Sequence, residues 1–351
     1  MPTISAAPLR QFAIDLLKAA GIPGEEATLV GTSLVDANLR GHDSHGVMRI
    51  PFYLDALKKG EVVAGAPFTV VSETDTLLSA DGHWGFGQTQ ASRLAERVCA
   101  KAKSAGVGIG TLVHSSHIGR LGEYCEYAAA QGLVSLLMVN THGHARRVAP
   151  PGGTAPRLGT NPLAFGVPAD DGPLVLDFGT SATAEGKVRV KKIAGQQCPP
   201  GWLLDSNGQP TTDPNSLYGT PPGTILPMGG DQAYKGFALG LIVEIFAGAL
   251  SGGVCIREKP LNQNGNCVYF QAIDPAALGG AEHFACEVKN LLLFIRDCPR
   301  VDGCNEILLP GDPERRMLAQ RTAQGLAFDE GNWTQLRELA GKLGVTVPDA
   351  A

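Results

Sequence analysis

Several features that would assign the protein to a familiar class are missing from its sequence. The 351 residues carry a net charge of −5 and contain no cluster of basic residues, so we expect neither a nucleic-acid partner nor an anionic membrane. The most apolar run, 237–250, has fourteen residues and includes Glu244. It is too short to cross a bilayer and predicts a buried helix.

Cysteine usage indicates a reducing compartment. The eight cysteines are scattered, and no Cys-x-x-Cys pair occurs, so we expect free thiols rather than a disulfide framework. The first eight residues have neither the basic nor the apolar segment of a secretory leader. We therefore expect a cytoplasmic protein, and its length predicts two or three lobes.

The sequence motifs of several common enzyme classes are also absent. No strand is followed by Gly-x-Gly-x-x-Gly, and there is no Walker A motif, no His-Glu-x-x-His and no Gly-x-Ser-x-Gly. An ordinary Rossmann site, a P-loop, a zincin and an α/β-hydrolase are all disfavoured.

The stretch from Gly41 to Tyr53 holds the densest set of groups that can move protons or bind anions. Its members His42, His45, Arg49 and Tyr53 are spaced i, i+3, i+7 and i+11, which would align them on one face of a helix. Pro51 favours an alternative, a loop bearing His45 and Arg49 with the proline in the first turn of a helix that ends near residue 59.

Either arrangement keeps an imidazole and a guanidinium close together. Arginine can hold a carboxylate through two parallel hydrogen bonds, and histidine titrates near neutral pH. The pair therefore suits a small acid as substrate. The simpler interpretation is a solvated helix start capped by Asp43 or Ser44.

A second polar stretch runs from His114 to Arg120, between a predicted strand and a predicted helix. Hydroxyls and N–H groups of 115–119 near a helix N-terminus favour an anion such as phosphate. The alternative is an ordinary strand–helix loop with capping serines.

Six of the eight histidines form three close pairs, at 42/45, 114/117 and 142/144. With Asp43 or Asp177 they are candidate metal ligands, which makes a metal-dependent hydrolase a rival hypothesis. A non-catalytic ligand-binding protein is a third possibility, disfavoured by the density of titratable groups in glycine-rich turns.

Hydrophobic periodicity predicts alternating helices and strands. The predicted helices are 9–20, 25–39, 88–105, 121–130, 182–193 (capped by Thr180 or Ser181), 235–250, 281–297, one from 314, and 329–343. The predicted strands are 68–71, 76–80 (ended by Asp81-Gly82), 107–113, 133–140, 163–167, 174–177, 267–272 and 307–309. Residues 141–218 look like an inserted α+β lobe with a mostly antiparallel sheet.

Taken in order, several short motifs resemble the malate/L-lactate dehydrogenase family, which includes L-sulfolactate and ureidoglycolate dehydrogenases. They are Gly-His-Asp-Ser-His-Gly-Val-x-Arg-x-x-x-Tyr (41–53), His-Ser-Ser-His-Ile-Gly-Arg (114–120), Gly-Thr-Asn-Pro (159–162), Leu-Asp-x-x-Thr-Ser (176–181), Gly-Lys (186–187), Pro-Gly-Trp (200–202) and Leu-Pro-Gly-Asp (309–312). The resemblance covers about 9–345 and is closest to the bacterial hydroxycarboxylate dehydrogenase B type, through 37–46, 114–118 and 248–253.

The resemblance implies an α/β (α+β) chain with a non-Rossmann, L-sulfolactate dehydrogenase-like fold. A helical lobe would comprise 1–75 and 313–351, a central substrate and dimer lobe 76–120 and 226–312, and an NAD(P)-binding lobe with a mainly antiparallel sheet 121–225. It further implies a homodimer that needs no metal. The implied reaction is NAD- or NADP-dependent reduction of a 2-oxo acid, or oxidation of a 2-hydroxy acid; the alternative is reduction of a cyclic imino acid.

The resemblance also assigns roles to individual residues. His45 would be the proton donor and acceptor, with Ser44 and Asp177 as partners that orient it or relay protons; His117 is the competing candidate. The substrate would contact Arg49, Tyr53, His117 and Thr160. The dinucleotide would contact His114, Ser115, Ser116, His117, Ile118, Asn140, Asp177, Phe178, Gly179, Lys235, Leu309, Pro310, Gly311, Glu314 and Arg315.

Overall fold

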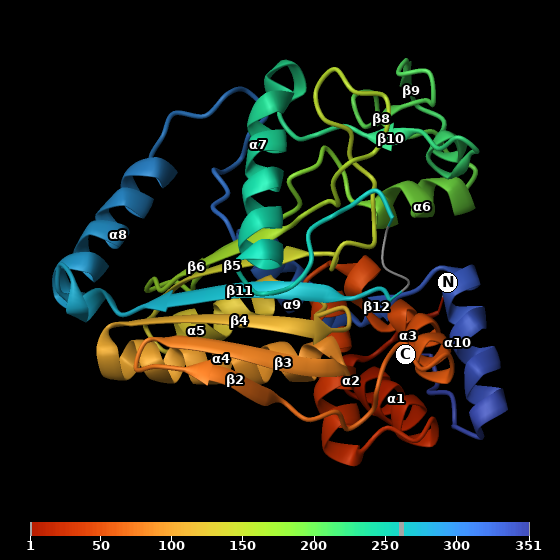
Figure 1. Ribbon diagram of the computed structural model, residues 1–351, viewed down its shortest axis with the longest axis horizontal. Helices are drawn as coiled ribbons and strands as arrows, with labels where there is room; N and C mark the ends of the chain where they lie inside the picture. The colour runs from red at the N-terminus through yellow and green to blue at the C-terminus, as the bar shows by residue number, and fades with distance from the viewer. Residues whose placement is uncertain (1, 260–262, 351) are drawn as a thin grey trace.

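A seven-stranded mixed sheet forms the centre of the computed structural model, which describes residues 2–259 and 263–350 (Figure 1). The strand order is β2-β3-β4-β11-β5-β6-β7, and every neighbouring pair is antiparallel except β3 and β4. The strands are β2 (Thr69–Glu73), β3 (Leu77–Gly85), β4 (Val107–Ser115), β5 (Val134–Asn140), β6 (Leu163–Val167), β7 (Leu174–Phe178) and β11 (Asn266–Ile273).

Helices cover both faces of this sheet (Figure 1). On one face lie α4 (Gly87–Ala105) and α5 (Gly122–Ala130), whose apolar side chains share a core with Leu112, Leu137 and Phe270. On the other lie α7 (Ala233–Glu244), its π-helical extension η5 (Ile245–Ala249) and α8 (Ala281–Arg296). The larger core is therefore on the α4–α5 side.

A helical unit at one end of the sheet is built from both ends of the chain. Its elements are α1 (Ala6–Ala19), α2 (Gly24–Leu39), α3 (Ile50–Lys58), α9 (Asp312–Gln324) and α10 (Glu330–Leu343). Strand β1 (Thr3–Ile4) pairs with β12 (Leu326–Ala327), and Phe12 packs on Trp333 with ring centroids 5.9 Å apart. One hydrophobic core joins these elements.

A smaller unit above the end of the sheet has its own core, which includes Val148, Val188 and Ile225. It holds α6 (Glu185–Ile193), η3 (Pro214–Tyr218), and the three-stranded antiparallel sheet of β8 (Leu203–Leu204), β9 (Pro210–Thr211) and β10 (Thr224–Ile225). The remaining short turns are η1 (Asp43–His45), η2 (Val47–Arg49), η4 (Gly230–Gln232) and η6 (Pro275–Ala277).

Most predicted elements are confirmed within a few residues, but the inserted lobe differs from its prediction. Strands β6 and β7 extend the central sheet instead of forming a sheet of their own. Helix α6 begins at Glu185 rather than 182 and has no side-chain cap, because Ser181 pairs with Pro227 and its hydroxyl donates to the Thr183 carbonyl.

Two predicted strand features are wrong. Residues 307–309 form no strand; the segment runs beside β7 with one hydrogen bond, from Val175 N–H to Pro310 O, and Pro310 has no N–H to continue a ladder. Strand β3 does not end at Asp81-Gly82 but continues to Gly85 through a register shift, where Asp81 accepts a hydrogen bond from His83 N–H.

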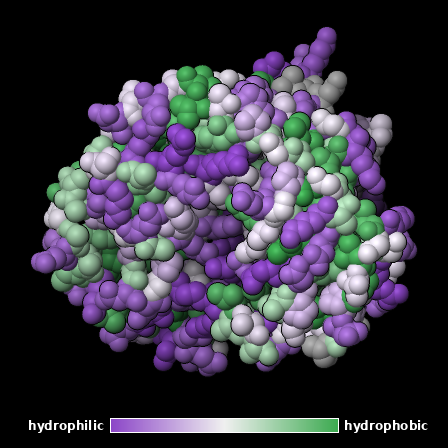
Figure 2. All heavy atoms as spheres, turned by 90° about the horizontal axis from the view of Figure 1, so that it is seen from below, coloured by the Kyte–Doolittle hydropathy of each residue, from purple (hydrophilic) through white to green (hydrophobic). Residues whose placement is uncertain are grey.

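The predicted buried helix at 237–250 is only half-buried. Gly240, Val243 and Ala247 face the sheet, whereas Leu241, Ile242 and Ile245 are exposed. The side of the molecule seen from below carries mixed polar and apolar residues, with a hydrophilic hollow near its centre (Figure 2). Within the described residues no helix is long and apolar enough to cross a membrane, and all eight cysteines are free.

Candidate active site

The polar residues singled out in the sequence gather at one end of the central sheet. Strands β3, β4, β5 and β7 end there, and β6 and β11 begin there. The His45 stretch approaches this end from the helical unit, and the 114–120 loop leaves β4 toward it. Contacts between the two stretches define the candidate site.

The His45 stretch adopts the loop alternative. Two 3-10 turns, η1 and η2, lead into α3, and Pro51 lies in its first turn. The single helical face is therefore wrong for this stretch: His42 turns away, and its Nε2 lies 3.4 Å from Glu314 Oε1 on α9.

Asn38, near the end of α2, holds this loop in place. Its side chain is 2% exposed; Nδ2 donates to Asp43 Oδ1 (2.7 Å), and Oδ1 accepts from Val47 N–H (2.8 Å). A side chain at Gly46 would collide with Asn38, since an added Cβ would lie 2.1 Å from Oδ1. From α9, Arg321 reaches both Asp43 and the Asn38 carbonyl.

Replacing Asn38 with alanine should therefore displace His45. We expect kcat to fall about 10- to 100-fold and the free energy of unfolding to fall by about 1–3 kcal/mol, because two buried hydrogen bonds are lost. Urea denaturation and steady-state kinetics measure the two effects, with Asn290→Ala on the exposed face of α8 as control. A variant that loses stability but keeps its kcat would show that the clamp does not set the catalytic geometry.

His45 and His117 stack face to face, with ring centroids 5.4 Å apart and 25° between the ring planes. Burial, together with a smaller contribution from the charge of Arg49, lowers the pKa of His45 to about 3. Its Nδ1 lies 3.0 Å from Ser44 Oγ. His45 is therefore a neutral imidazole at physiological pH, held by a hydroxyl that can either donate or accept.

The tautomer of His117 follows from its neighbours. Gln88 Nε2 donates to Tyr53 Oη (2.9 Å), which leaves the tyrosine hydroxyl to donate to His117 Nδ1 (2.9 Å). Gly119 N–H approaches the same Nδ1 at 3.3 Å. Because Nδ1 is an acceptor, the proton of the neutral ring is on Nε2, which makes His117 a fixed hydrogen-bond donor. Gln88, fully buried on α4, was not predicted from the sequence.

The terminal nitrogens of Arg49 are available to bind a ligand at the site. Its Nε donates to the Ser44 carbonyl (2.7 Å), whereas Nη1 and Nη2 form no hydrogen bond with any residue that the structure describes. Helix α6 of the smaller unit packs against the same stretch. A Cβ at Gly186 would lie 3.3 Å from Ser44 Cβ, and the Arg189 guanidinium lies 5.5 Å above the Phe52 ring.

The Asp177 carboxylate forms its hydrogen bond away from the His45–His117 pair. Its Oδ2 accepts a hydrogen bond from Gly122 N–H at the start of α5 (2.7 Å), not from Ser44 or His45. Burial raises the pKa of its carboxyl, and the hydrogen bond from Gly122 and the charge of Arg120 oppose this rise. Arg120, itself 3% exposed and paired with Glu126, was also not predicted.

The 115–119 loop uses most of its donors internally. Ser115 Oγ donates to the Ser116 carbonyl, Ser116 Oγ accepts from Gly87 N–H, and Ile118 N–H donates to Asn266 Oδ1. This geometry fits the ordinary-loop alternative better than a phosphate site.

The other predicted site residues occupy different environments. Asn140 is fully buried, and its side chain binds Glu244 Oε1 and the Val254 carbonyl. Thr160 lies against Gly179 at the sheet end, with its carbonyl bound by Thr180. Lys235 is exposed on the first turn of α7, about 20 Å along the helix from Gly248, which contacts Asn140.

His114 belongs to a second cluster. Its Nδ1 lies 2.9 Å from Asp81 Oδ2, and its ring packs against Trp84 and His142 at 5.2 and 5.4 Å. The three histidine pairs therefore separate instead of converging. Among residues 2–259 and 263–350, no group of three or more histidine, cysteine, aspartate or glutamate side chains is arranged to hold a metal ion.

Comparison with known proteins identifies the scaffold. The family model for malate/L-lactate dehydrogenase matches residues 4–337. The chain belongs to the malate/L-lactate dehydrogenase family. It is 37% identical to an L-lactate dehydrogenase of Cupriavidus necator, over 99% of both chains. It is also 35% identical to hydroxycarboxylate dehydrogenase B of Escherichia coli K12, over 96% of this chain and 93% of that one.

Solved structures of family members share the fold. Sulfolactate dehydrogenase from Methanocaldococcus jannaschii superposes with a TM-score of 0.87, at 33% identity and 98% coverage of each chain. A delta1-piperideine-2-carboxylate reductase from Pseudomonas syringae superposes with a TM-score of 0.83, at 32% identity, over 97% of this chain and 100% of that chain. Membership confirms the family resemblance and makes the protein an oxidoreductase of the hydroxy-acid dehydrogenase type.

Proposed function

We propose that the protein is an NAD(P)-dependent 2-hydroxy acid dehydrogenase that also reduces the matching 2-oxo acid. The observation that carries the proposal is the combination of a neutral His45 with the unengaged end of Arg49 at the sheet end. The neutral imidazole can take the hydroxyl proton of a 2-hydroxy acid, and the guanidinium can bind the adjacent carboxylate.

In this mechanism Arg49 fixes the substrate. Two parallel hydrogen bonds from Nη1 and Nη2 to the carboxylate would orient the neighbouring carbon, while His117 Nε2–H donates a hydrogen bond to a substrate oxygen. His45 then accepts the hydroxyl proton during oxidation or returns it during reduction, with Ser44 Oγ steadying its Nδ1.

The outer edge of β7 beyond Val175 fits an extended dinucleotide. Val175 N–H donates outward to Pro310 O, so the Asp177 N–H, two residues on, also points away from β6 toward this edge. Gly179, without a side chain, continues the edge beside Thr160. Asp177–Gly179 and Leu309–Gly311 are the residues we assign to holding NAD or NADP, which supplies or accepts the hydride.

A cyclic imino-acid reductase is the second candidate, favoured by the similarity to the Pseudomonas syringae reductase. Such a substrate also carries a carboxylate for Arg49, and its ring nitrogen would take the place of the 2-oxo oxygen beside His45. The two candidates therefore share one set of protein groups and differ only in substrate.

The experiment that tests the proposal follows absorbance at the reduced-nicotinamide band. EDTA-treated protein is mixed with NADH or NADPH and with pyruvate, hydroxypyruvate, phenylpyruvate, oxaloacetate or a cyclic imine. Oxidation with a 2-oxo acid supports the dehydrogenase, and oxidation with the imine alone supports the reductase. No oxidation with any of them, together with hydrolysis of esters or amides after adding zinc, would overturn both.

We also propose a homodimer, on the evidence of the face of the sheet that bears α7 and α8. Apolar side chains are exposed there on both helices and on the sheet between them: Phe165, Leu176, Leu241, Ile242, Ile245, Leu291 and Phe294. A contiguous apolar surface of this kind is typical of an interface between subunits.

Ile242→Asp should therefore shift the protein to monomers. A charge at the centre of an apolar interface is costly to bury, and sedimentation velocity measures the resulting mass. Val71→Asp introduces the same charge at an exposed position on β2; it is the control and should leave the mass unchanged. A wild-type protein that sediments as a monomer would contradict the proposal.

A further inference from the structure

A hollow of about 560 Å³ lies outside the catalytic stretch, and arginines form most of its lining. The residues around this arginine hollow are Arg146, Arg157, Ile256, Arg257 and Glu258. Residues 146 and 157 lie on two segments that pair in an antiparallel bridge, and 256–258 follow η5. The whole chain has a net charge of −5, so three guanidinium groups around one hollow reverse the sign of the charge locally.

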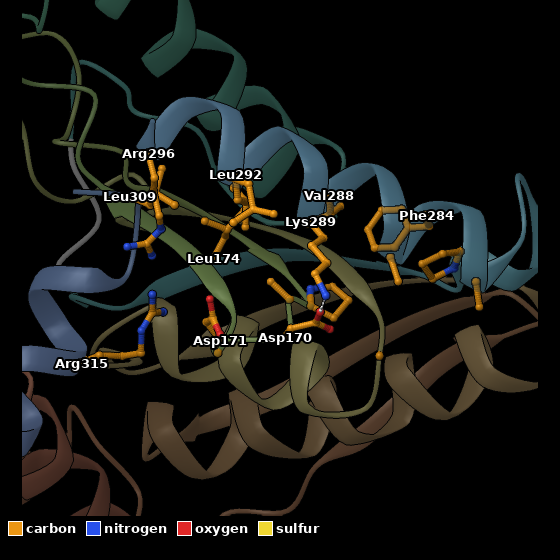
Figure 3. Close-up of a pocket in the computed structure, with 18 residues that line it drawn as sticks. Asp170, Asp171, Leu174, Phe284, Val288, Lys289, Leu292, Arg296, Leu309 and Arg315 are labelled. Carbon is orange, nitrogen blue, oxygen red and sulfur yellow. Dashed lines mark ion pairs between the residues drawn. The ribbon is translucent and has the colours of Figure 1, made fainter. Parts of the chain in front are cut away.

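Basic side chains around another cavity of the molecule have acidic partners. In the cavity beneath α8, Lys289 points toward Asp170 and lies 3.4 Å from it (Figure 3). Arg296 and Arg315 at the same cavity both contact Asp312. In the arginine hollow, by contrast, no guanidinium forms an ion pair with a residue that the structure describes.

Most N–H groups of the three arginines are not used within the protein. Arg146 Nη1 donates to the Glu258 carbonyl (3.2 Å), and Arg157 Nη1 donates to the Pro156 carbonyl (3.1 Å). Arg257 forms no hydrogen bond with any residue that the structure describes. Each guanidinium has five N–H donors, so two carbonyl acceptors leave most of them available. An anion in the hollow would bind these donors and relieve the repulsion between the like charges.

The backbone segments that carry the arginines are held by hydrogen bonds. Arg157 N–H donates to the Val148 carbonyl (2.8 Å). Ile256 N–H donates to Oε1 of Glu244 (2.7 Å), which is only 3% exposed. A side chain at Gly143 would collide with the segment after η5, since an added Cβ would lie 2.9 Å from its nearest atom. The arginine hollow is therefore largely preformed, which limits the ordering that a ligand must impose.

We propose that the arginine hollow binds a small polyanion with two or more adjacent phosphate groups, either free pyrophosphate or the phosphates of a nucleotide. Arginine binds a phosphate group through two parallel hydrogen bonds, and three arginines suit a ligand with several negative charges. The hollow has the volume of a small-molecule site. Its lining residues differ from those assigned to the substrate and the dinucleotide, so the inference does not rest on the proposed function.

Isothermal titration calorimetry with inorganic pyrophosphate at low ionic strength tests the proposal. We expect the wild type to bind pyrophosphate, and Arg157→Gln and Arg257→Gln each to bind it about 10-fold more weakly. Glu258→Gln removes the acidic side chain from the lining and should strengthen binding about threefold. The control is Arg337→Gln, which removes the same charge from an exposed position on α10 and should change the affinity less than twofold.

A titration with ATP distinguishes the two sources of phosphate. Tighter binding of ATP than of pyrophosphate indicates a nucleotide, and weaker binding indicates free pyrophosphate. Thermal unfolding of each variant shows that it is folded.

Two results would overturn the inference. If the wild type does not bind pyrophosphate, or if all four variants bind it as the wild type does, the arginine hollow is not an anion site. If Arg257→Gln weakens NADH, measured by fluorescence, as much as pyrophosphate, the hollow belongs to the dinucleotide site and a separate site is excluded. Both results leave the dehydrogenase proposal standing, because that proposal is tested by turnover of 2-oxo acids.

Discussion

Replacing His45 with alanine is expected to lower kcat by about 10³-fold or more, while the affinity for NADH changes less than threefold. Proton transfer by a positioned side chain typically contributes 10²- to 10⁴-fold, and alanine also leaves Ser44 without its partner. NADH is not expected to depend on His45, because the groups assigned to it lie along β7 and 309–311. Stopped-flow absorbance measures turnover, and NADH fluorescence measures affinity.

His117→Asn is the matched comparison. The Tyr53 hydroxyl fixes His117 as a donor through Nε2, so this residue can bind a substrate oxygen but cannot accept the proton there. Asparagine retains a donor, and we expect a loss of only about 10-fold, mostly in KM. If His117→Asn abolishes turnover while His45→Ala merely slows it, the acid–base assignment is reversed.

Replacing Arg49 with methionine should have an effect of similar size, seen mainly in kcat/KM. Losing two charge-assisted hydrogen bonds to the substrate carboxylate removes about 3–6 kcal/mol, equivalent to a 10²- to 10⁴-fold decrease. Arg49→Lys keeps the charge but not the paired geometry, and should recover only part of the loss. A methionine variant with unchanged kcat/KM would place the carboxylate elsewhere.

Arg49 should also link substrate binding to the acidity of His45. The guanidinium charge helps to lower the pKa of His45 to about 3. A bound carboxylate neutralises that charge, so the pKa of His45 should rise when substrate binds. Oxidation needs the neutral imidazole. Because kcat/KM reports the free enzyme, protonation of His45 should not lower kcat/KM above about pH 4. In the profile of kcat, which reports the substrate complex, the decrease on the acid side should begin at a higher pH than in the profile of kcat/KM.

The sequence predicts the backbone of the 41–53 stretch well because the information for it is local. Pro51 distinguishes a loop followed by a helix from one continuous helix, and the four-residue spacing of His45 and Arg49 survives either way. Periodicity likewise finds the helices of the terminal unit, since each buries one apolar face. The family motifs supply the reaction class, which the comparisons confirm.

The residues that hold the site together are far apart in the sequence, so no single motif contains them. Gln88, Tyr53 and His117 form one relay although 35 and 64 residues separate the bonded pairs. The Asn140 side chain donates a hydrogen bond to Glu244, 104 residues away. Histidine pairs that look equivalent in the sequence separate for the same reason, because strand ends and loops carry them to different faces.

The predicted domain bounds and the cytoplasmic location remain predictions. A domain boundary depends on which core a segment joins, which a local sequence pattern does not show. The sedimentation experiment on Ile242 addresses the subunit interface directly.

The contacts of Arg321 with Asp43 and the Asn38 carbonyl have a consequence for the order of biosynthesis. During translation, Asp43 and the neighbouring His45 leave the ribosome almost 280 residues before Arg321, which contacts Asp43. Nascent chains that end before Arg321 therefore lack its contacts with Asp43 and the Asn38 carbonyl. The loop that bears His45 gains these contacts only once α9 has docked, so we expect a product that ends before Arg321 to be inactive.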